Sequence, residues 1–342
     1  MQKSVSPWQK VDTDEVSHHV ACRIRDLTVT YQTEAGEFPA VSHINLDILS
    51  GRITAIIGES GSGKSTLGLT LLNGISAPGR IVSGSVSYAD HGKNALALKG
   101  RALRNLRGAY VGTVFQASQN TMNPVNRVRQ QIVDLARSHG RDARGLLKEA
   151  ETLARTMAMN PQRVLNAYPH QLSGGMRQRI GLIMALVLQP QILLLDEPTT
   201  ALDLLTQSRV LEIIKVVQQQ RQLTTVLITH DIGVVAEVAD QVAVMYAGSI
   251  VEQGPTRVVL GHPRHPYTHA LARSMPRLTG DLRRIRPLHG SPPDLTMIPS
   301  EGCVFRDRCR YRLDRCERER PPLEDVGGDQ RRACYWEGAL DD

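Results

Sequence analysis

The sequence is poor in aromatic residues. Phe, Trp and Tyr together make up only 4% of its 342 residues, whereas proteins that bind single-stranded nucleic acid stack the bases on such side chains. The arginines are scattered among acidic residues, and the net charge of +7 is modest for this length. We therefore expect no nucleic acid among the partners.

Long apolar runs are also missing. The longest, LIMALVL and ILLL, fall far short of the roughly 18–20 residues that a membrane span needs. The first residues, MQKSVSPWQKVDTDEVSHH, lack the apolar core of a secretory signal. We expect a chain that is made and kept in the cytosol, where lasting disulfides are disfavoured.

Cysteine is scarce, yet four of the five cysteines fall within residues 303–334. A disulfide knot, unlinked buried thiols and a metal site would each account for this cluster. Their spacing, C-x₅-C-x₆-C-x₁₇-C, lacks the C-x₂₋₄-C pairs typical of structural zinc sites. Four thiolates can equally hold a [4Fe–4S] cluster. The four candidate ligands are Cys303, Cys309, Cys316 and Cys334.

Apolar periodicity predicts an α/β fold with additional strands in an edge sheet. CRIRDLTVTYQ and AVSHINLDIL alternate apolar and polar residues, as strands of an edge sheet do. The segment RITAIIG is predicted to be a strand, the glycine-rich residues after it a turn, and STLGLTLLNGI a helix. ILLLDEP and TTVLITHD begin with continuous apolar runs, which are typical of parallel strands covered on both faces.

Composition divides the chain into three parts. Residues 1–20 are a polar arm, and residues 21–256 carry the α/β pattern, with a mostly helical segment at about 117–175. From about residue 257 to residue 342 the chain is richer in Pro, His and Arg. We therefore expect a main domain followed by a C-terminal extension that contains the cysteine cluster.

A phosphate-binding motif lies between the first buried strand and its helix. GESGSGKST, residues 58–66, matches G-x-x-x-x-G-K-[ST]. Its glycines let successive backbone N–H groups point at a phosphate, and the helix N-terminus adds its positive end. Lys64 can reach the β- and γ-phosphates, and Ser65 can bind Mg²⁺. The predicted nucleotide-binding residues are Gly58, Ser60, Gly61, Ser62, Gly63, Lys64, Ser65 and Thr66.

Two acids follow the strand ILLL directly. This position is the C-terminal edge of a parallel sheet, where ligands of such folds bind. Asp196 would hold Mg²⁺ through water, and Glu197 would act as general base on the attacking water.

A second glycine motif, LSGGMRQR, spans residues 172–179. Ser173, Gly174 and Gly175 would form another phosphate nest at a helix start. One chain has no need of two nests, but the arrangement makes sense if this one caps the γ-phosphate bound by a second chain. Here the sequence resembles the ATP-binding cassette (ABC) ATPase family, whose signature is LSGGQ, with Met176 in place of the glutamine.

This resemblance covers about residues 21–256 and implies an ABC-type P-loop fold with a RecA-like sheet core, an antiparallel β subdomain and a helical subdomain. It also implies further site residues. Tyr31 resembles the aromatic residue that stacks on adenine, and Gln116 resembles the Q-loop residue that contacts Mg²⁺ and the attacking water. Asp203, in TTALD, matches the D-loop, and His230 matches the switch histidine that contacts the γ-phosphate.

A narrower resemblance extends into the tail. YPHQLSGGMRQR, MNPV and HPRHPYTHALARSMP are similar to the ATPase subunits of dipeptide, oligopeptide and nickel importers, of the D-type or F-type, with the D-type favoured. Some relatives of this type carry a [4Fe–4S] cluster, which we expect here in preference to Zn²⁺, beside ATP and Mg²⁺. The implied partners are two membrane permease subunits, a second related ATPase and an extracytoplasmic solute-binding protein.

The resemblance places the chain at the cytoplasmic face of the inner membrane, as a peripheral subunit that hydrolyses ATP to drive import. ABC ATPases also act as soluble proteins in iron–sulfur assembly or on nucleic acids. However, the sequence shows no heptad run for a coiled-coil arm and no second P-loop. The transported solute is not encoded in these motifs.

Overall fold

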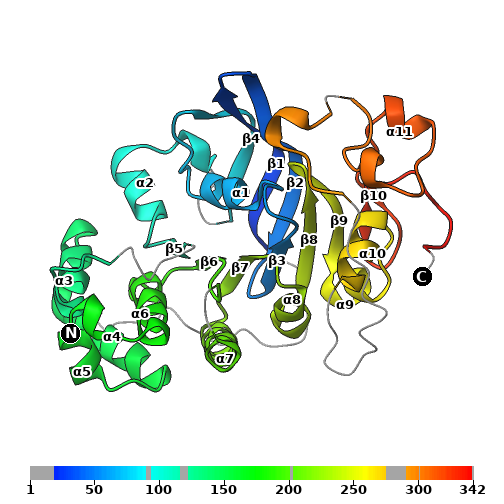
Figure 1. Cartoon of the computed structure of the whole chain (residues 1–342). Helices are drawn as coiled ribbons and strands as arrows, with labels where there is room; N and C mark the ends of the chain where they lie inside the picture. The colour runs from blue at the N-terminus through cyan, green and yellow to red at the C-terminus, as the bar shows by residue number, and fades with distance from the viewer. Residues whose placement is uncertain are drawn as a thin grey trace.

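The computed structural model of the chain describes residues 19–89, 94–115, 122–200, 203–274, 290–299 and 301–340. Two sheets organise these residues (Figure 1). One has three strands in the order β2-β1-β4, and the other has eight in the order β10-β11-β9-β8-β3-β7-β6-β5. No helix in these ranges is long and apolar enough to cross a membrane.

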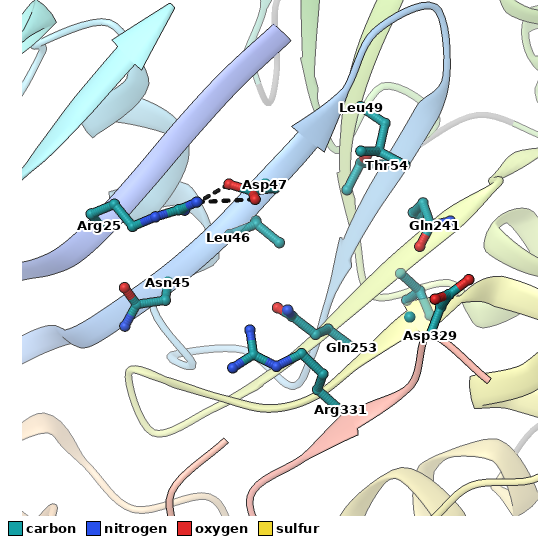
Figure 2. Close-up of a pocket in the computed structure, with 12 residues that line it drawn as sticks. Arg25, Asn45, Leu46, Asp47, Leu49, Thr54, Gln241, Gln253, Asp329 and Arg331 are labelled. Atoms are coloured by element: carbon teal, nitrogen blue, oxygen red, sulfur yellow. Dashed lines mark hydrogen bonds and ion pairs between the residues drawn. The ribbon is translucent and has the colours of Figure 1, made fainter. Parts of the chain in front are cut away.

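The three-stranded sheet is antiparallel throughout and consists of β1 (Val20–Thr33), β2 (Gly36–Leu49) and β4 (Gly79–Tyr88). Its alternating apolar residues are buried on one face, as the pattern predicts. On its polar side, Arg25 of β1 and Asp47 of β2 form an ion pair with an N–O distance of 2.6 Å (Figure 2). The sheet is the predicted antiparallel β subdomain.

Five parallel strands form one side of the eight-stranded sheet, and they include the predicted apolar runs TAII, ILLL and TTVLIT. They are β3 (Ile53–Ile57), β5 (Val111–Val114), β6 (Ile192–Asp196), β7 (Thr224–Thr229) and β8 (Gln241–Tyr246). β9 (Ser249–Pro255) adds antiparallel to β8. The helices of this part are α1 (Lys64–Leu71), α2 (Gly100–Leu106), α6 (Gly174–Leu186), α7 (Leu204–Arg221) and α8 (Ile232–Val238), with a short turn η1 (Ala95–Ala97).

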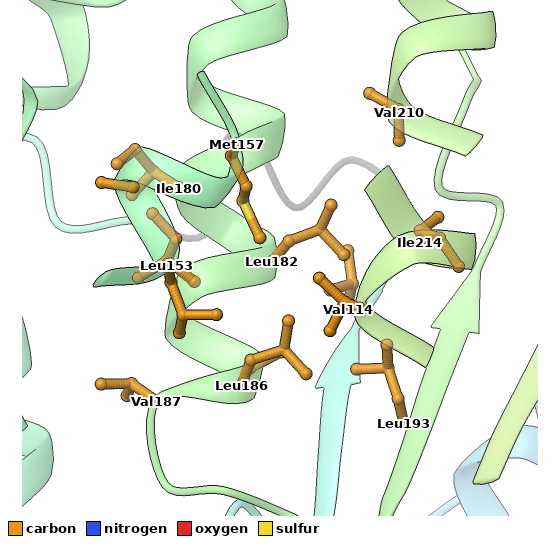
Figure 3. Close-up of a cluster of buried hydrophobic side chains, with 14 of the residues drawn as sticks. Val114, Leu153, Met157, Ile180, Leu182, Leu186, Val187, Leu193, Val210 and Ile214 are labelled. Carbon is orange, nitrogen blue, oxygen red and sulfur yellow. The ribbon is translucent and has the colours of Figure 1, made fainter. Parts of the chain in front are cut away.

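Three helices stand to one side of the sheets: α3 (Val128–Ser138), α4 (Ala143–Thr156) and α5 (Pro161–Asn166), followed by the turn η3 (Pro169–Gln171) (Figure 1). Their apolar faces join the main core through α6. Leu153 of α4 and Met157, which directly follows that helix, pack in one cluster with Ile180 and Leu186 of α6. The same cluster includes Leu193 of β6 (Figure 3). Helix α6 therefore connects the helical region to the sheet.

The residues after β9 fold against that edge of the large sheet. They form α9 (Thr256–Gly261), α10 (Pro266–Arg273), η5 (Leu295–Met297), η6 (Arg306–Arg308), α11 (Arg315–Arg318), β10 (Glu324–Asp325) and β11 (Arg331–Arg332). β11 pairs antiparallel with β9, so the extension completes the sheet edge. Two-residue strands carry no periodicity, so no sequence pattern predicts the pairing of β11 with β9.

A buried polar network fixes the start of the extension. The carboxylate of Glu252, which is fully buried, accepts hydrogen bonds from the backbone N–H groups of Arg264 (2.7 Å) and His265 (3.1 Å) and from the amide of Gln330 (2.6 Å). His265, 1% exposed, accepts the N–H of Tyr267 at 3.0 Å and so caps α10. Burial, with a smaller contribution from Arg332, lowers the pKa of His265 to about 3.

We expect His265 to make the protein less stable in mild acid. Below its ordinary pKa of 6.5 the residue is protonated in the unfolded chain, but the folded chain keeps it neutral down to about pH 3. The unfolded state therefore takes up more protons, and about 2 kcal/mol of unfolding free energy is lost between pH 7 and pH 5. His265→Asn keeps a helix cap without a titrating group, so denaturant unfolding at the two pH values should show a flatter dependence. The exposed His170→Asn variant should keep the wild-type slope, and an unchanged slope in His265→Asn would contradict the assignment.

Candidate nucleotide site

A cavity of about 1210 Å³ lies around the turn between β3 and α1. The phosphate motif from Gly58 to Thr66 forms its floor, and Glu197 and His230 line it from the ends of β6 and β7. Tyr31 of β1 lines the same cavity. The structure thus brings together residues that lie up to 200 positions apart in the sequence.

Two glycines of the turn allow no side chain. An added Cβ at Gly58 would lie 2.2 Å from the carbonyl oxygen of Met245, and one at Gly63 would lie 2.2 Å from that of Ala40. Gly63 also has a φ of +96°, which residues with a side chain rarely adopt. The turn is therefore pressed between β2 and β8, and its amides keep one arrangement.

Lys64 lies inside the turn and is 7% exposed. Its ammonium donates to the backbone oxygens of Gly58 and Glu59 at 2.8 Å each, and to the hydroxyl of Ser62 at a longer 3.4 Å. Burial lowers the pKa of Lys64, while the nearby acids, Glu197 foremost, oppose that shift. The long contact to Ser62 is the one that a phosphate oxygen would replace most easily.

Ser65 and Asp196 fit a magnesium site. The Ser65 hydroxyl donates to the Asp196 carboxylate at 3.3 Å, across the first turn of α1 and the end of β6. Burial raises the pKa of Asp196, and the hydrogen bond from Ser65 works against that shift. Hydroxyl and carboxylate oxygens are ligands that Mg²⁺ prefers, and the cation would hold Asp196 in its charged form.

Glu197 is held in an unusual backbone conformation. Its φ is +53°, and its N–H donates to the carbonyl oxygen of Ile228 at 2.9 Å. The two carboxylate oxygens are separately engaged, by His230 at 2.8 Å and by the hydroxyl of Thr200 at 2.6 Å. Strained backbone that persists at a cavity wall is a mark of a functional site. The geometry aims one acid at the cavity, as a general base requires.

The signature residues lie elsewhere. Ser173 is exposed and caps α6 by accepting the N–H of Met176 at 3.3 Å. Ser173, Gly174 and Gly175 do not line the P-loop cavity. Instead Gly175 packs on Thr206, where an added Cβ would meet the methyl group at 2.8 Å.

Asp203 belongs with the signature rather than with the cavity. Its carboxylate caps α7 by accepting the N–H of Thr206 at 3.0 Å and the Thr206 hydroxyl at 2.7 Å. These hydrogen bonds lower the pKa of Asp203. Gln116, the remaining predicted site residue, lies outside the described residues.

The four tail cysteines gather in one part of the extension. Cys303 and Cys316 are buried, and the N–H of Cys303 donates to the carbonyl oxygen of Cys316 at 2.8 Å. Burial raises the pKa of Cys303 to about 12 and that of Cys309 to about 11. All of these thiols are free rather than disulfide-linked. In the described part of the chain, no three His, Cys, Asp or Glu side chains are arranged to hold a metal ion, so the expected cluster finds no support in this arrangement.

A second cavity, of about 410 Å³, lies at the opposite ends of the parallel strands (Figure 2). Thr54 and Gln241 line it from the starts of β3 and β8, and Arg331 lines it from the extension. Ligands of open parallel sheets bind at the carboxyl ends of the strands. The nucleotide is therefore assigned to the P-loop cavity and not to this one.

Comparisons with known proteins agree with the geometry. A family model described as ABC transporter matches residues 41–200, and one described as oligopeptide/dipeptide transporter, C-terminal region, matches residues 251–316. The dipeptide transport ATP-binding protein DppD of Caldanaerobacter subterraneus is 39% identical over 92% of this chain and 97% of its own length. DppD of Escherichia coli is 37% identical over 92% and 96%.

The chain belongs to the ABC transporter family. Among solved structures, the dimeric structure of MJ0796, a bacterial ABC transporter cassette, is 28% identical with a TM-score of 0.60, covering 69% of this chain and 99% of that one. The predicted fold class is confirmed, and the protein is an ABC ATPase that couples ATP hydrolysis to transport.

Sequence reasoning missed several contacts of this ABC ATPase. Thr200 holds Glu197, and Tyr267 and Arg308 of the extension contact Glu59 of the P-loop. Thr200 lies four residues after Asp196 in DEPTT, so its nearness could have been noticed. Tyr267 and Arg308 lie far from the P-loop in sequence, and no pattern within one chain indicates such a pairing.

We expect Gly175→Ala to destabilise the ABC ATPase by roughly 1–3 kcal/mol through overpacking against Thr206. The double variant Gly175→Ala/Thr206→Ser should recover most of that loss, because serine lacks the clashing methyl group but keeps the hydroxyl that bonds Asp203. Denaturant unfolding and ATPase rates of the two single variants and the double variant check this. Equal losses in Gly175→Ala and the double variant would show that the close contact with Thr206 is not the reason for glycine.

Proposed function

We propose that the chain is the ATPase subunit of an importer for dipeptides or a related small solute. The observation that carries the proposal is that the likeness to dipeptide transport ATP-binding proteins spans 92% of the chain, extension included. The match of residues 251–316 to the oligopeptide/dipeptide transporter C-terminal region supports the same substrate class. A soluble ATPase of iron–sulfur assembly or nucleic-acid handling would not share that extension.

The geometry supports a nucleotide sandwich between two ATPase chains. In this chain the P-loop, Glu197 and His230 share one cavity, while Ser173 and the following glycines stand apart from it. A partner's signature would close over the triphosphate held by Lys64, and this chain's signature would close the partner's site. The dimeric MJ0796 cassette is a precedent for pairing in the family. We propose that the partner is a second, related ATPase.

Within one closed site, different side chains of this chain would have different roles. The turn amides and Lys64 would bind the phosphates, and Ser65, Asp196 and Gln116 would hold Mg²⁺, which neutralises phosphate charge. Glu197 would take a proton from the attacking water, and His230, 2.8 Å from it, would fix the carboxylate and contact the γ-phosphate. Closure of the dimer would gate hydrolysis, since only then are all groups present.

The proposed assembly places this subunit at the cytoplasmic face of the inner membrane, beneath two permease subunits, with a solute-binding protein on the far side. Co-expression with the permease, ATPase and binding-protein genes of the same cluster, followed by reconstitution in liposomes, tests this. ATPase activity should rise when the binding protein and a dipeptide are present. A complex that forms without permeases and is stimulated by nucleic acid would favour the alternative function.

Glu197→Gln should bind ATP but not hydrolyse it, because the amide cannot accept the proton from water. Turnover should fall by at least about 100-fold, the usual contribution of a general base, while ATP binding is retained and transport is lost. Equilibrium binding of labelled ATP and steady-state phosphate release measure the two effects. Thr200→Val, which removes only a hydrogen bond to Glu197, should show a smaller loss of turnover. Normal turnover in Glu197→Gln would remove Glu197 from the role of base.

We further propose that the four tail cysteines bind a [4Fe–4S] cluster, or Zn²⁺, that pins the extension. The support is the collection of four thiols in one part of the extension, where Cys303 is electrostatically coupled to the other three. The raised pKa values mean that a metal would have to displace protons from buried thiols, and a loss of protons on binding is usual for such sites. The arrangement of side chains described above does not itself support the metal, so the test is chemical.

Anaerobically purified protein should contain about four irons and four sulfides per chain. It should also be coloured, with the visible absorption that iron–sulfur clusters give. Cys316→Ser should lose the iron, whereas Cys22→Ser, in the buried core of the β subdomain, should keep it. Stoichiometric zinc without iron would assign the zinc alternative. Protein with neither metal after anaerobic purification would leave the four residues as ordinary free thiols, two of them buried.

A further inference from the structure

An ion pair joins the P-loop to the cysteine-containing extension. The guanidinium of Arg308 contacts both carboxylate oxygens of Glu59, at 2.6 and 3.1 Å, although the two residues lie 249 positions apart. The side chain of Arg308 is only 7% exposed and that of Glu59 is 24% exposed. Paired, sheltered contacts of this kind are among the stronger ion pairs in proteins.

Glu59 is the second residue of the phosphate motif and is held on three sides. Its N–H donates to the hydroxyl oxygen of Tyr267 at 2.9 Å, and its carbonyl oxygen accepts from Lys64 at 2.8 Å. Arg308 holds its side chain. Two of these three contacts come from the extension, and the third comes from the lysine that is expected to bind phosphate.

Arg308 is itself held rigidly. Its guanidinium lies 5.6 Å from the ring centroid of Tyr246 and donates to the carbonyl oxygen of Gly290 at 3.1 Å. Phe305, three residues before it, packs its ring 5.1 Å from Tyr246 and 5.4 Å from Tyr267, measured between centroids. The extension is thus docked by an aromatic cluster that directs Arg308 at the P-loop (the yellow and orange segments beside β8 and β9 in Figure 1).

The charge of Glu59 affects nucleotide binding because Glu59 lines the nucleotide cavity. An unpaired carboxylate at that wall would repel a bound triphosphate. Arg308 neutralises it and holds it in one position. Burial disfavours the charged guanidinium, yet the hydrogen bonds to Glu59 and Tyr246 raise the pKa of Arg308 above its ordinary value. The extension also supplies part of the cavity wall, through Leu271, Ser274, Pro292, Pro293 and Asp294.

We propose that Arg308 is a positioning residue for ATP: it pairs with Glu59 so that the P-loop binds nucleotide at full affinity only when the extension is docked. The proposal rests on ATP binding at the P-loop, which belongs to the family activity, and does not depend on the identity of the transported solute. Under this proposal the C-terminal extension contributes to the affinity of the P-loop for nucleotide.

Three variants of the full-length chain test this, with MgATP affinity measured by equilibrium titration with a fluorescent ATP analogue and competition by ATP. Arg308→Gln leaves Glu59 unpaired and should raise the dissociation constant roughly fivefold to tenfold. Glu59→Gln leaves a positive charge near the phosphates and should lower the dissociation constant. The double variant, with neither charge, should return toward the wild-type value, because the unfavourable carboxylate is gone.

A purely structural ion pair predicts a different pattern. If the pair only docks the extension, Glu59→Gln weakens ATP binding as much as Arg308→Gln does, and the double variant is no better than either. That result would overturn the proposal. Glu59→Gln decides between the two explanations even if Arg308→Gln does not fold, because residue 59 lies on a turn with its side chain partly exposed and glutamine is close to glutamate in size.

The matched control is Arg312→Gln, which removes an ion pair within the extension, to Glu317 at 2.8 Å, that does not touch the P-loop. It should leave the ATP dissociation constant unchanged. Thermal unfolding of each variant separates folding from binding, and raising the salt concentration should shrink the difference between wild type and Arg308→Gln, as charge repulsion is screened. A salt-independent difference would contradict the electrostatic role. Failure here would leave the importer assignment untouched, because that assignment is tested by transport.

Discussion

The site depends on one steric constraint: the P-loop backbone is pressed between one strand of each sheet. Gly63 lies against the carbonyl of Ala40 in β2, and Gly58 lies against that of Met245 in β8, each too close for a side chain. The turn cannot change without moving one of the sheets. The flanking strands therefore hold the backbone N–H groups of the turn in one orientation. Lys64 lies buried inside the turn, where carbonyl oxygens and nearby acids balance its charge. A phosphate site needs this preorganisation because flexible amides would lose affinity to ordering.

A similar rigidity holds the signature residues away from the P-loop cavity, as the proposed two-chain site requires. The Ser173 end of α6 is fixed by the contact of Gly175 with Thr206, and Thr206 is fixed by Asp203. The signature and D-loop thus form a second rigid face, distinct from the P-loop face. Helix α6 also packs against α4 through Ile180 and Leu153. The start of α6 therefore contacts both the helical region and the Thr206 end of α7, and in the proposed sandwich a shift of α6 would move the signature together with these neighbours.

How far sequence could lead depended on whether a feature was local. The P-loop, the acids after β6 and the alternating strands of the β subdomain are each encoded within about ten residues, and the fold class followed from them. The arrangement of the site residues around the cavity followed too, since strand ends of a parallel sheet meet at one edge. The pairing of β11 with β9, the positive φ of Glu197 and the contacts of Tyr267 and Arg308 with Glu59 were out of reach. They arise from packing between distant segments, which no local pattern records.

The packing of the C-terminal extension on the main domain is one feature that local sequence patterns do not reveal. In sequence it is a basic, proline-rich tail whose cysteines invite a separate explanation, yet its backbone continues the main sheet and its aromatic cluster packs on Tyr246 of β8. Tyr246 directly follows Met245, whose carbonyl confines Gly58, so the extension supports the strand that shapes the P-loop. Arg308 and Cys309 are neighbours in the chain. A change in the thiols that moved this segment would therefore also displace Arg308, and with it the ion pair to Glu59 at the wall of the P-loop cavity.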